Sequence, residues 1–68
     1  MTLSARNHLQ GTIDEVQLGD VLAHVTVRVA GGLIESVITR RSAEEMGLKK
    51  GDQVAAVVKA TEVMISKP

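Results

Sequence analysis

The chain has 68 residues, enough for one small domain with a limited apolar core. It contains no Cys, which excludes disulfides and thiolate zinc sites, and it contains no Phe, Trp or Tyr. Eight basic residues balance eight acidic ones, so the totals give no basic footprint for a nucleic acid. No apolar run approaches the roughly 20 residues of a membrane span. We therefore expect one soluble, cytoplasmic domain over residues 1–68, stabilised by oligomerisation.

A first strand is predicted from Leu9 to Val16. Its alternation of inward and outward residues breaks near Asp14-Glu15. One extra residue in a strand moves every later side chain to the other face, so a β-bulge at this point would restore the phase. The segment Leu18-Gly19-Asp20 is then expected to turn the chain into the next strand.

The middle of the sequence predicts a β-hairpin. Residues 21–29 and 33–40 both alternate with a period of two and are rich in β-branched side chains. One face of the first run collects five small or branched apolar residues: Val21, Ala23, Val25, Val27 and Val29. Ala30-Gly31-Gly32 suits the tight reversal between the runs, because Gly tolerates a positive φ.

A short helix and two last strands complete the predicted order. Ser42-Ala43-Glu44-Glu45 matches a capping box with Ser42 as the N-cap, and Gly47 offers a C-terminal cap. Residues 49–52 form a polar turn, and residues 53–59 and 62–66 are predicted as strands. The layout β-β-β-α-β-β predicts an all-β fold with one short helix, a five-stranded antiparallel barrel of the oligonucleotide/oligosaccharide-binding type.

Catalysis is not indicated by any group of residues. Asp14-Glu15 and Glu44-Glu45 are adjacent pairs, whose carboxylates point apart in a strand or a short helix. His8 and His24 are expected to be exposed strand residues. No Gly-rich phosphate loop follows a strand as a P-loop requires. We therefore expect a protein that is not an enzyme.

Three groups of hydrogen-bond donors predict an anion site instead. Ser4-Ala5-Arg6-Asn7 precedes the first strand, Lys59-Ala60-Thr61 lies at the far end of the chain, and Thr39 and Ser42 follow the third strand. All of these groups can donate hydrogen bonds, and none is a carboxylate. The alternative interpretation is that Ser42 serves only as a helix cap and that Arg6 and Lys59 are solvated, Lys59 beside Glu62.

The same motifs resemble a known family. Ser4-Ala5-Arg6-Asn7-x-Leu9-x-Gly11-x-Ile13 is similar to the opening of the molybdate-binding Mop domain, which is found alone in molbindins. The similarity continues in order through Gly31-Gly32, Ile38-Thr39-x-x-Ser42, Gly47-Leu48-x-x-Gly51 and residues 57–63. It covers essentially the whole chain, and the combination of S-A-R-N with K-A-T is its most specific part.

The resemblance implies a function and a site. Molbindins are small cytoplasmic barrels that assemble as hexamers, trimers of dimers, and bind molybdate or tungstate between subunits for storage or homeostasis. The implied oxyanion ligands are Ser4, Arg6, Thr39, Ser42, Lys59, Ala60 and Thr61, with Ala60 donating only through its backbone N–H. The family has a second type of site, for which Asn7 and His8 are candidates.

Two alternatives belong to a different class of function. A nucleic-acid-binding barrel would use aromatic platforms for base stacking, and this chain has no aromatic residue. A swapped-hairpin DNA-binding module of the AbrB type is suggested by Met46-Gly47-Leu48-Lys49-Lys50-Gly51-Asp52-Gln53-Val54. That turn is a generic device, and the basic residues that a DNA contact needs are scattered.

Overall fold

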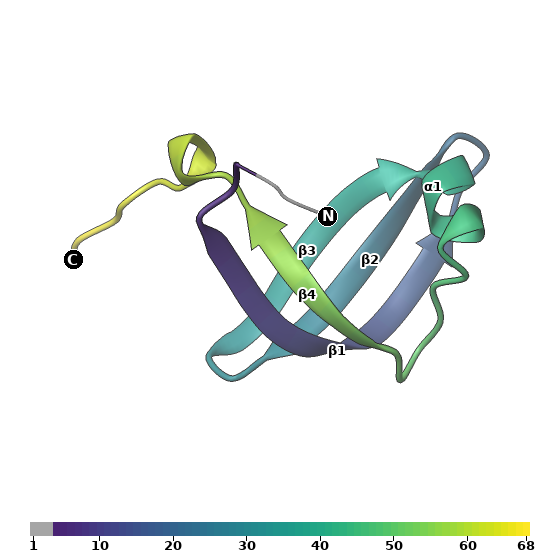
Figure 1. The fold of residues 1–68 in the computed structure, drawn as a ribbon, viewed down its shortest axis with the longest axis horizontal. Helices are drawn as coiled ribbons and strands as arrows, with labels where there is room; N and C mark the ends of the chain where they lie inside the picture. Colours follow the sequence, from purple (N-terminus) through teal and green to yellow (C-terminus); the bar gives the residue numbers. More distant parts are fainter. Residues whose placement is uncertain (1–3) are drawn as a thin grey trace.

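A four-stranded antiparallel sheet forms the body of the protein in the computed structural model, which describes residues 4–68 (Figure 1). The strands follow the spatial order β3-β2-β1-β4. Their bounds are Asn7–Leu18 for β1, Leu22–Val29 for β2, Gly32–Thr39 for β3 and Gln53–Val58 for β4. Helix α1 spans Arg40–Glu45 and the 3-10 helix η1 spans Ala60–Glu62. Within residues 4–68, no helix is long and apolar enough to cross a membrane.

The predicted bulge in β1 is confirmed. The register of β1 with β2 shifts between Ile13 and Glu15, which leaves Asp14 as the extra residue. Ile13 is buried and Val16 packs against the same core, although three positions separate them. The Arg28 guanidinium donates to the Asp14 carboxylate across the pair at 3.0 Å. The bulge therefore restores the apolar face of β1, as the broken alternation predicts.

The core is small, and apolar side chains remain exposed around it. The buried apolar residues of the described chain are Ile13, Ala23, Val25, Val27 and Ala43. Val21 was predicted on the same face, but β2 begins one residue later and leaves Val21 72% exposed. Large apolar residues also stay exposed at the C-terminal end, where Met64 and Ile65 are about nine-tenths accessible. Such surface is what a partner subunit would cover.

Gly11 lies where the sheet has no room for a side chain. A Cβ at this position would collide with the Arg28 carbonyl oxygen and lie 2.9 Å from the side chains of Val27 and Val29. We expect Gly11→Ala to lower the free energy of unfolding by about 3 kcal/mol, because overpacking against backbone forces the strands apart. Urea unfolding measures the change. Gly31→Ala is the matched control, since a Cβ at Gly31 meets nothing within 4 Å, and equal losses in the two variants would contradict the interpretation.

The start of α1 differs from the prediction. The N-cap is Thr39, whose Oγ1 accepts from the Ser42 backbone N–H at 3.1 Å, so the capping box with Ser42 as the N-cap is wrong. Glu45 does not reach back to the cap and pairs instead with Arg41 at 3.0 Å. The reason is the sheet: β3 stays paired to β2 up to Thr39 opposite Leu22, and the helix begins at the next residue.

The end of α1 is confirmed. Gly47 has φ +62, the left-handed conformation that glycine adopts without strain. Its N–H bonds the Glu44 carbonyl and the Leu48 N–H bonds the Ala43 carbonyl, at 3.0 and 3.1 Å. This pair of bonds is a Schellman motif, which satisfies the last helical carbonyls.

The turn after α1 places β4 beside β1. The backbone N–H and Nζ of Lys49 donate to the Asp52 carboxylate at 3.0 and 2.9 Å, and these bonds hold the pKa of Asp52 below its usual value. The Ile13 N–H bonds the Asp52 carbonyl, and the Gly51 N–H bonds the Ile13 carbonyl, both at 2.9 Å. From this anchor, β4 runs antiparallel to β1.

The predicted fifth strand does not form within this single chain. Residues 60–62 are 3-10 helical, and residues 63–68 carry no regular structure and extend away from the body (Figure 1). A strand needs a neighbouring ladder for its backbone groups, and these residues have none. The sheet consequently stays open, with β3 and β4 as its two edges. The coarser prediction of a mostly β fold with one short α-helix is confirmed.

Candidate anion-binding site

The sheet brings two of the predicted donor segments together. β1 begins at Asn7 and the antiparallel β4 ends at Val58, and these two residues are partners in the register. Arg6 and Lys59 therefore lie on neighbouring segments of the same chain, just beyond the last pair. Both are exposed, and neither forms an ion pair within residues 4–68, so the predicted alternative pairing of Lys59 with Glu62 is absent there.

Further predicted donors lie close to these two cations along the chain. Ser4 is exposed, and Ala60 and Thr61 lie in η1, which follows Lys59 directly. The N–H groups at the start of η1 have no intrahelical carbonyl to bond, because the first turn of any helix leaves its donors unpaired. We call Ser4, Arg6, Lys59, Ala60 and Thr61 the basic half.

Thr39 and Ser42 form a second group, which we call the hydroxyl half. The Thr39 hydroxyl donates to the Ser42 Oγ at 2.9 Å while it accepts from the Ser42 N–H at 3.1 Å. This arrangement uses the Thr39 hydrogen and leaves the hydrogen of the Ser42 hydroxyl available for a bound anion. Ser42 is half-buried and Thr39 is exposed.

The two halves lie at opposite ends of the chain's sheet (Figure 1). β1 starts at the basic half, while β3 runs in the same direction as β1 and ends at the hydroxyl half. β1 has 12 residues, so the path between its ends is on the order of 36 Å at about 3.3 Å per residue. A single copy does not bring the seven predicted ligands into one pocket.

The two candidates for a second site lie beside the basic half. The Asn7 side-chain amide donates to the Val58 carbonyl at 3.2 Å and is half-buried. His8 is exposed, with Nε2 3.2 Å from the Ala5 carbonyl. His24 lies on the outer face of the sheet and pairs with Glu35 at 2.9 Å. Within residues 4–68, no cluster of His, Asp or Glu is arranged to hold a metal cation.

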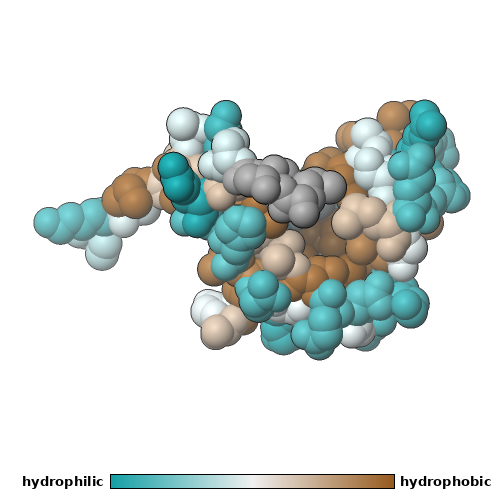
Figure 2. All heavy atoms as spheres, viewed as in Figure 1, coloured by the Kyte–Doolittle hydropathy of each residue, from teal (hydrophilic) through white to brown (hydrophobic). Residues whose placement is uncertain are grey.

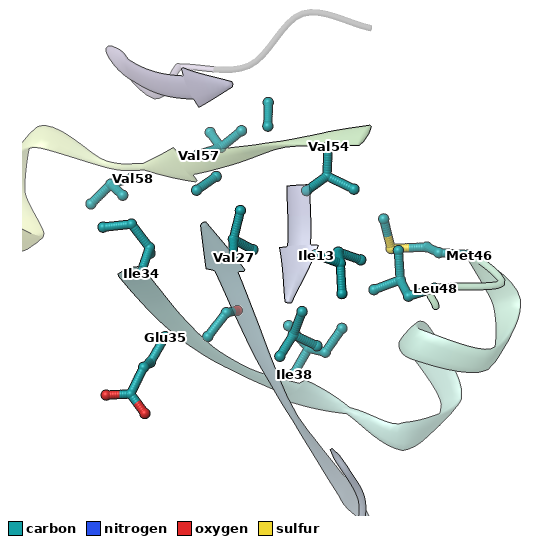
Figure 3. A pocket seen from close by; sticks show the side chains of 14 residues that line it. Ile13, Val27, Ile34, Glu35, Ile38, Met46, Leu48, Val54, Val57 and Val58 are labelled. Atoms are coloured by element: carbon teal, nitrogen blue, oxygen red, sulfur yellow. The ribbon is translucent and has the colours of Figure 1, made fainter. Parts of the chain in front are cut away.

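An apolar groove, which the sequence did not lead us to expect, lies between the two sheet edges. It has a volume of about 280 Å³ and is lined from β3 by Ile34 and Ile38, and from β4 by Val54 and Val58 (Figure 3). Met46 and Leu48 bound it beyond α1. Figure 2 shows apolar surface in this hollow and again on the C-terminal segment. The signal in the sequence was the alternation of apolar residues in the two strands that form the sheet edges, β3 and β4.

Comparison with known proteins assigns the chain to a class. The TOBE domain model matches residues 3–65. Molybdenum-pterin-binding protein 2 of Clostridium pasteurianum is 47% identical over 66 residues, which are 96% of this chain and 97% of that protein. The chain belongs to the TOBE domain family and, within it, to the molybdenum-pterin-binding proteins.

Solved structures agree with this assignment. A molybdate-binding protein from Sporomusa ovata matches with a TM-score of 0.93 and 37% identity, over 98% of this chain and 100% of that one. The cytoplasmic molybdate-binding protein ModG, solved with molybdate bound, matches with a TM-score of 0.81 and 44% identity. That match covers 88% of this chain and 43% of ModG. All three relatives are named as binding proteins and not as enzymes, and the family assignment does not support either nucleic-acid alternative.

Proposed function

We propose that this protein binds molybdate, or tungstate, between subunits and serves intracellular storage or homeostasis of the oxyanion in the cytoplasm. The observation that carries the proposal is the near full-length match to molybdate-binding proteins, one of them solved with the anion in place. The predicted ligands fit that chemistry, because none of them is a carboxylate.

The chemistry of the two halves suits a tetrahedral dianion. Molybdate at neutral pH accepts hydrogen bonds and donates none, so a pocket of N–H and O–H groups satisfies it. Arg6 and Lys59 supply charge-assisted bonds, which are roughly twice as strong as neutral ones. Their lack of carboxylate partners within residues 4–68 leaves both cations available.

The separation of the halves supports a site shared by two copies. The basic half of one subunit meets the hydroxyl half of its partner, and a two-fold axis repeats the contact. An isologous pair then holds two equivalent sites, one per chain. Exclusion of water at such an interface strengthens each hydrogen bond to the anion.

The C-terminal segment supplies the contact that brings the copies together. Val63, Met64 and Ile65 are exposed and apolar, and Glu62 alone separates them from Thr61. Val63 already has extended backbone angles. Seated in the partner's groove, this segment becomes the predicted fifth strand, closes the barrel and delivers the basic half to the partner. The groove is lined by Ile38, the neighbour of Thr39, so the delivered donors arrive beside the hydroxyl half.

Exposed apolar surface also favours assembly beyond the dimer. The exposed apolar residues outside the groove, such as Leu22 and Val37, leave surface for further contacts between dimers. We propose the hexamer, a trimer of dimers, as the full assembly. The second type of site, with Asn7 and His8 as candidates, remains part of that proposal.

Binding of molybdate is expected to raise the melting temperature of the assembly. A ligand that binds the assembled state and not the unfolded chain adds about 2.7 kcal/mol per site at 100 times its dissociation constant. Thermal melts with sodium molybdate and with sodium chloride at equal ionic strength measure the difference, and calorimetric titration gives the stoichiometry. Equal shifts with the two salts would reduce the effect to general screening and contradict the proposed function.

A further inference from the structure

Asn7 makes a contact that joins the two chain segments of the basic half. Its side-chain Nδ2 donates to the Val58 carbonyl at 3.2 Å, across 51 positions of sequence. The two residues are the last pair of the β1–β4 ladder. Arg6 precedes Asn7 and Lys59 follows Val58, so both cations lie just beyond this end of the ladder, one on each strand's extension. The bond therefore lies between the backbone segments that carry the two proposed cationic ligands.

We propose that Asn7 is a positioning residue that fixes Arg6 relative to Lys59. The proposal rests on the proposed molybdate site. The ends of a ladder open with little free-energy cost, because few contacts hold them. A side-chain bond across the final pair opposes that opening. With it, the cations are held at a constant spacing before the anion arrives, and less ordering is needed on binding.

The surroundings of Asn7 favour this role. Asn7 is half-buried, whereas Ser4, Arg6, Lys59 and Thr61 are all exposed. Exposed side chains on short segments gain their geometry from the backbone that carries them. The Asn7–Val58 bond is the side-chain contact that joins the two segments within residues 4–68.

The chain contains a matched contact at the other end of the same two strands. Gln53 donates from Nε2 to the Thr12 hydroxyl at 3.0 Å, and these residues are the opposite terminal pair of the ladder. Both bonds cross β1 and β4, and both come from a side-chain amide. Only the Asn7 bond adjoins the basic half. Loss of either bond should therefore destabilise the ladder, whereas only loss of the Asn7 bond should weaken anion binding.

The test compares Asn7→Leu, which keeps the size of the side chain without its donor, with Gln53→Met. Sodium molybdate is titrated calorimetrically into each folded assembly at one salt concentration, and each is also melted. We expect Asn7→Leu to weaken molybdate binding at least tenfold at an unchanged number of anions per chain, and Gln53→Met to leave the affinity within twofold. A lower number of anions bound in Asn7→Leu would instead assign Asn7 to the second type of site as a ligand and overturn the positioning role. The two melting temperatures should fall by similar amounts. Asn7→Ser, whose hydroxyl is too short for the contact, should match Asn7→Leu and decides the question if the Leu variant does not assemble.

The outcomes separate this inference from the function on which it rests. A parent protein that does not bind molybdate overturns the proposed function. A parent that binds, with Asn7→Leu or its Ser substitute within twofold of it, overturns the positioning role alone. Equal losses of affinity in the Asn7 and Gln53 variants also overturn it, because the contact would then act only through the stability of the ladder.

Discussion

Lys59→Met and Arg6→Gln are each expected to weaken molybdate binding by about 2 kcal/mol, roughly 30-fold, because each removes a hydrogen bond from a charged donor. Neither change removes core volume, since both side chains are exposed. The melting temperature without ligand should therefore stay near that of the parent. Calorimetric titration of the variants, beside melting curves, measures both quantities.

The control for these variants is Lys50→Met, which removes an exposed lysine in the turn after α1. It changes the net charge as Lys59→Met does, but it lies outside both halves. Unchanged binding in Lys59→Met and Arg6→Gln would show that the site is wrong even if the fold is right. A similar loss in Lys50→Met would show that the anion responds to net charge and not to particular donors.

Mixing two variants tests the division of the site between subunits. In a dimer of Lys59→Met with Ser42→Ala, one site carries both changes and the other site carries neither. Refolding the two variants together should therefore restore one intact site in each mixed dimer. If each site took both halves from a single chain, every site in the mixture would carry one change and molybdate binding would not recover.

Ile65→Asp is expected to break the assembly. Burial of an Ile side chain stabilises by about 1.5–3 kcal/mol, and a charge in an apolar groove adds a further penalty. Two grooves are affected in each dimer, so light scattering should show the mass fall toward that of one chain. Molybdate binding should be lost with it, although every proposed ligand is intact.

Ser66→Asp is the matched control for the segment. It adds the same charge one position later, on the opposite face of an extended strand. We expect Ser66→Asp to keep the mass and the affinity of the parent. If Ile65→Asp also keeps both, the C-terminal segment does not occupy the partner's groove.

Short sequence patterns predicted the features that depend on neighbouring residues alone, such as the bulge in β1 and the end of α1. The broken alternation at Asp14 indicates a bulge, because a strand with one buried face must keep its phase. Gly47 ends α1 because its left-handed conformation favours glycine. The N-cap was wrong because Thr39-x-x-Ser42 and Ser42-x-x-Glu45 share the same spacing. The pairing of β3 with β2 up to Thr39 decides which motif caps the helix. A local motif does not show where strand pairing ends.

The features that the sequence did not predict, the missing fifth strand and the separation of the two halves, depend on non-local pairing. Residues 62–66 have strand-like composition, but strand formation depends on an available neighbour as well as on propensity. The sequence showed which residues of the candidate site can donate hydrogen bonds. It did not show that these residues lie at opposite ends of the sheet. Arg6 and Lys59 extend from the same end of the sheet only because β4 pairs with β1, and Thr39 lies at the opposite end from them because β3 follows two reversals of the chain. Family resemblance supplied the ligand set that spacing alone leaves open.

Because the two halves lie at opposite ends of the sheet, the proposed shared site would make retention of the anion depend on the concentration of the protein. A chain alone would offer each anion only part of the proposed ligand set. Dilution below the concentration at which copies dissociate therefore releases the anion, even at constant free molybdate. Linkage also works in reverse, since bound anion holds the copies together. Under the proposed storage role, the number of anions held per chain would therefore rise with the cellular abundance of the protein, and synthesis of more protein would increase the capacity of the chains already present.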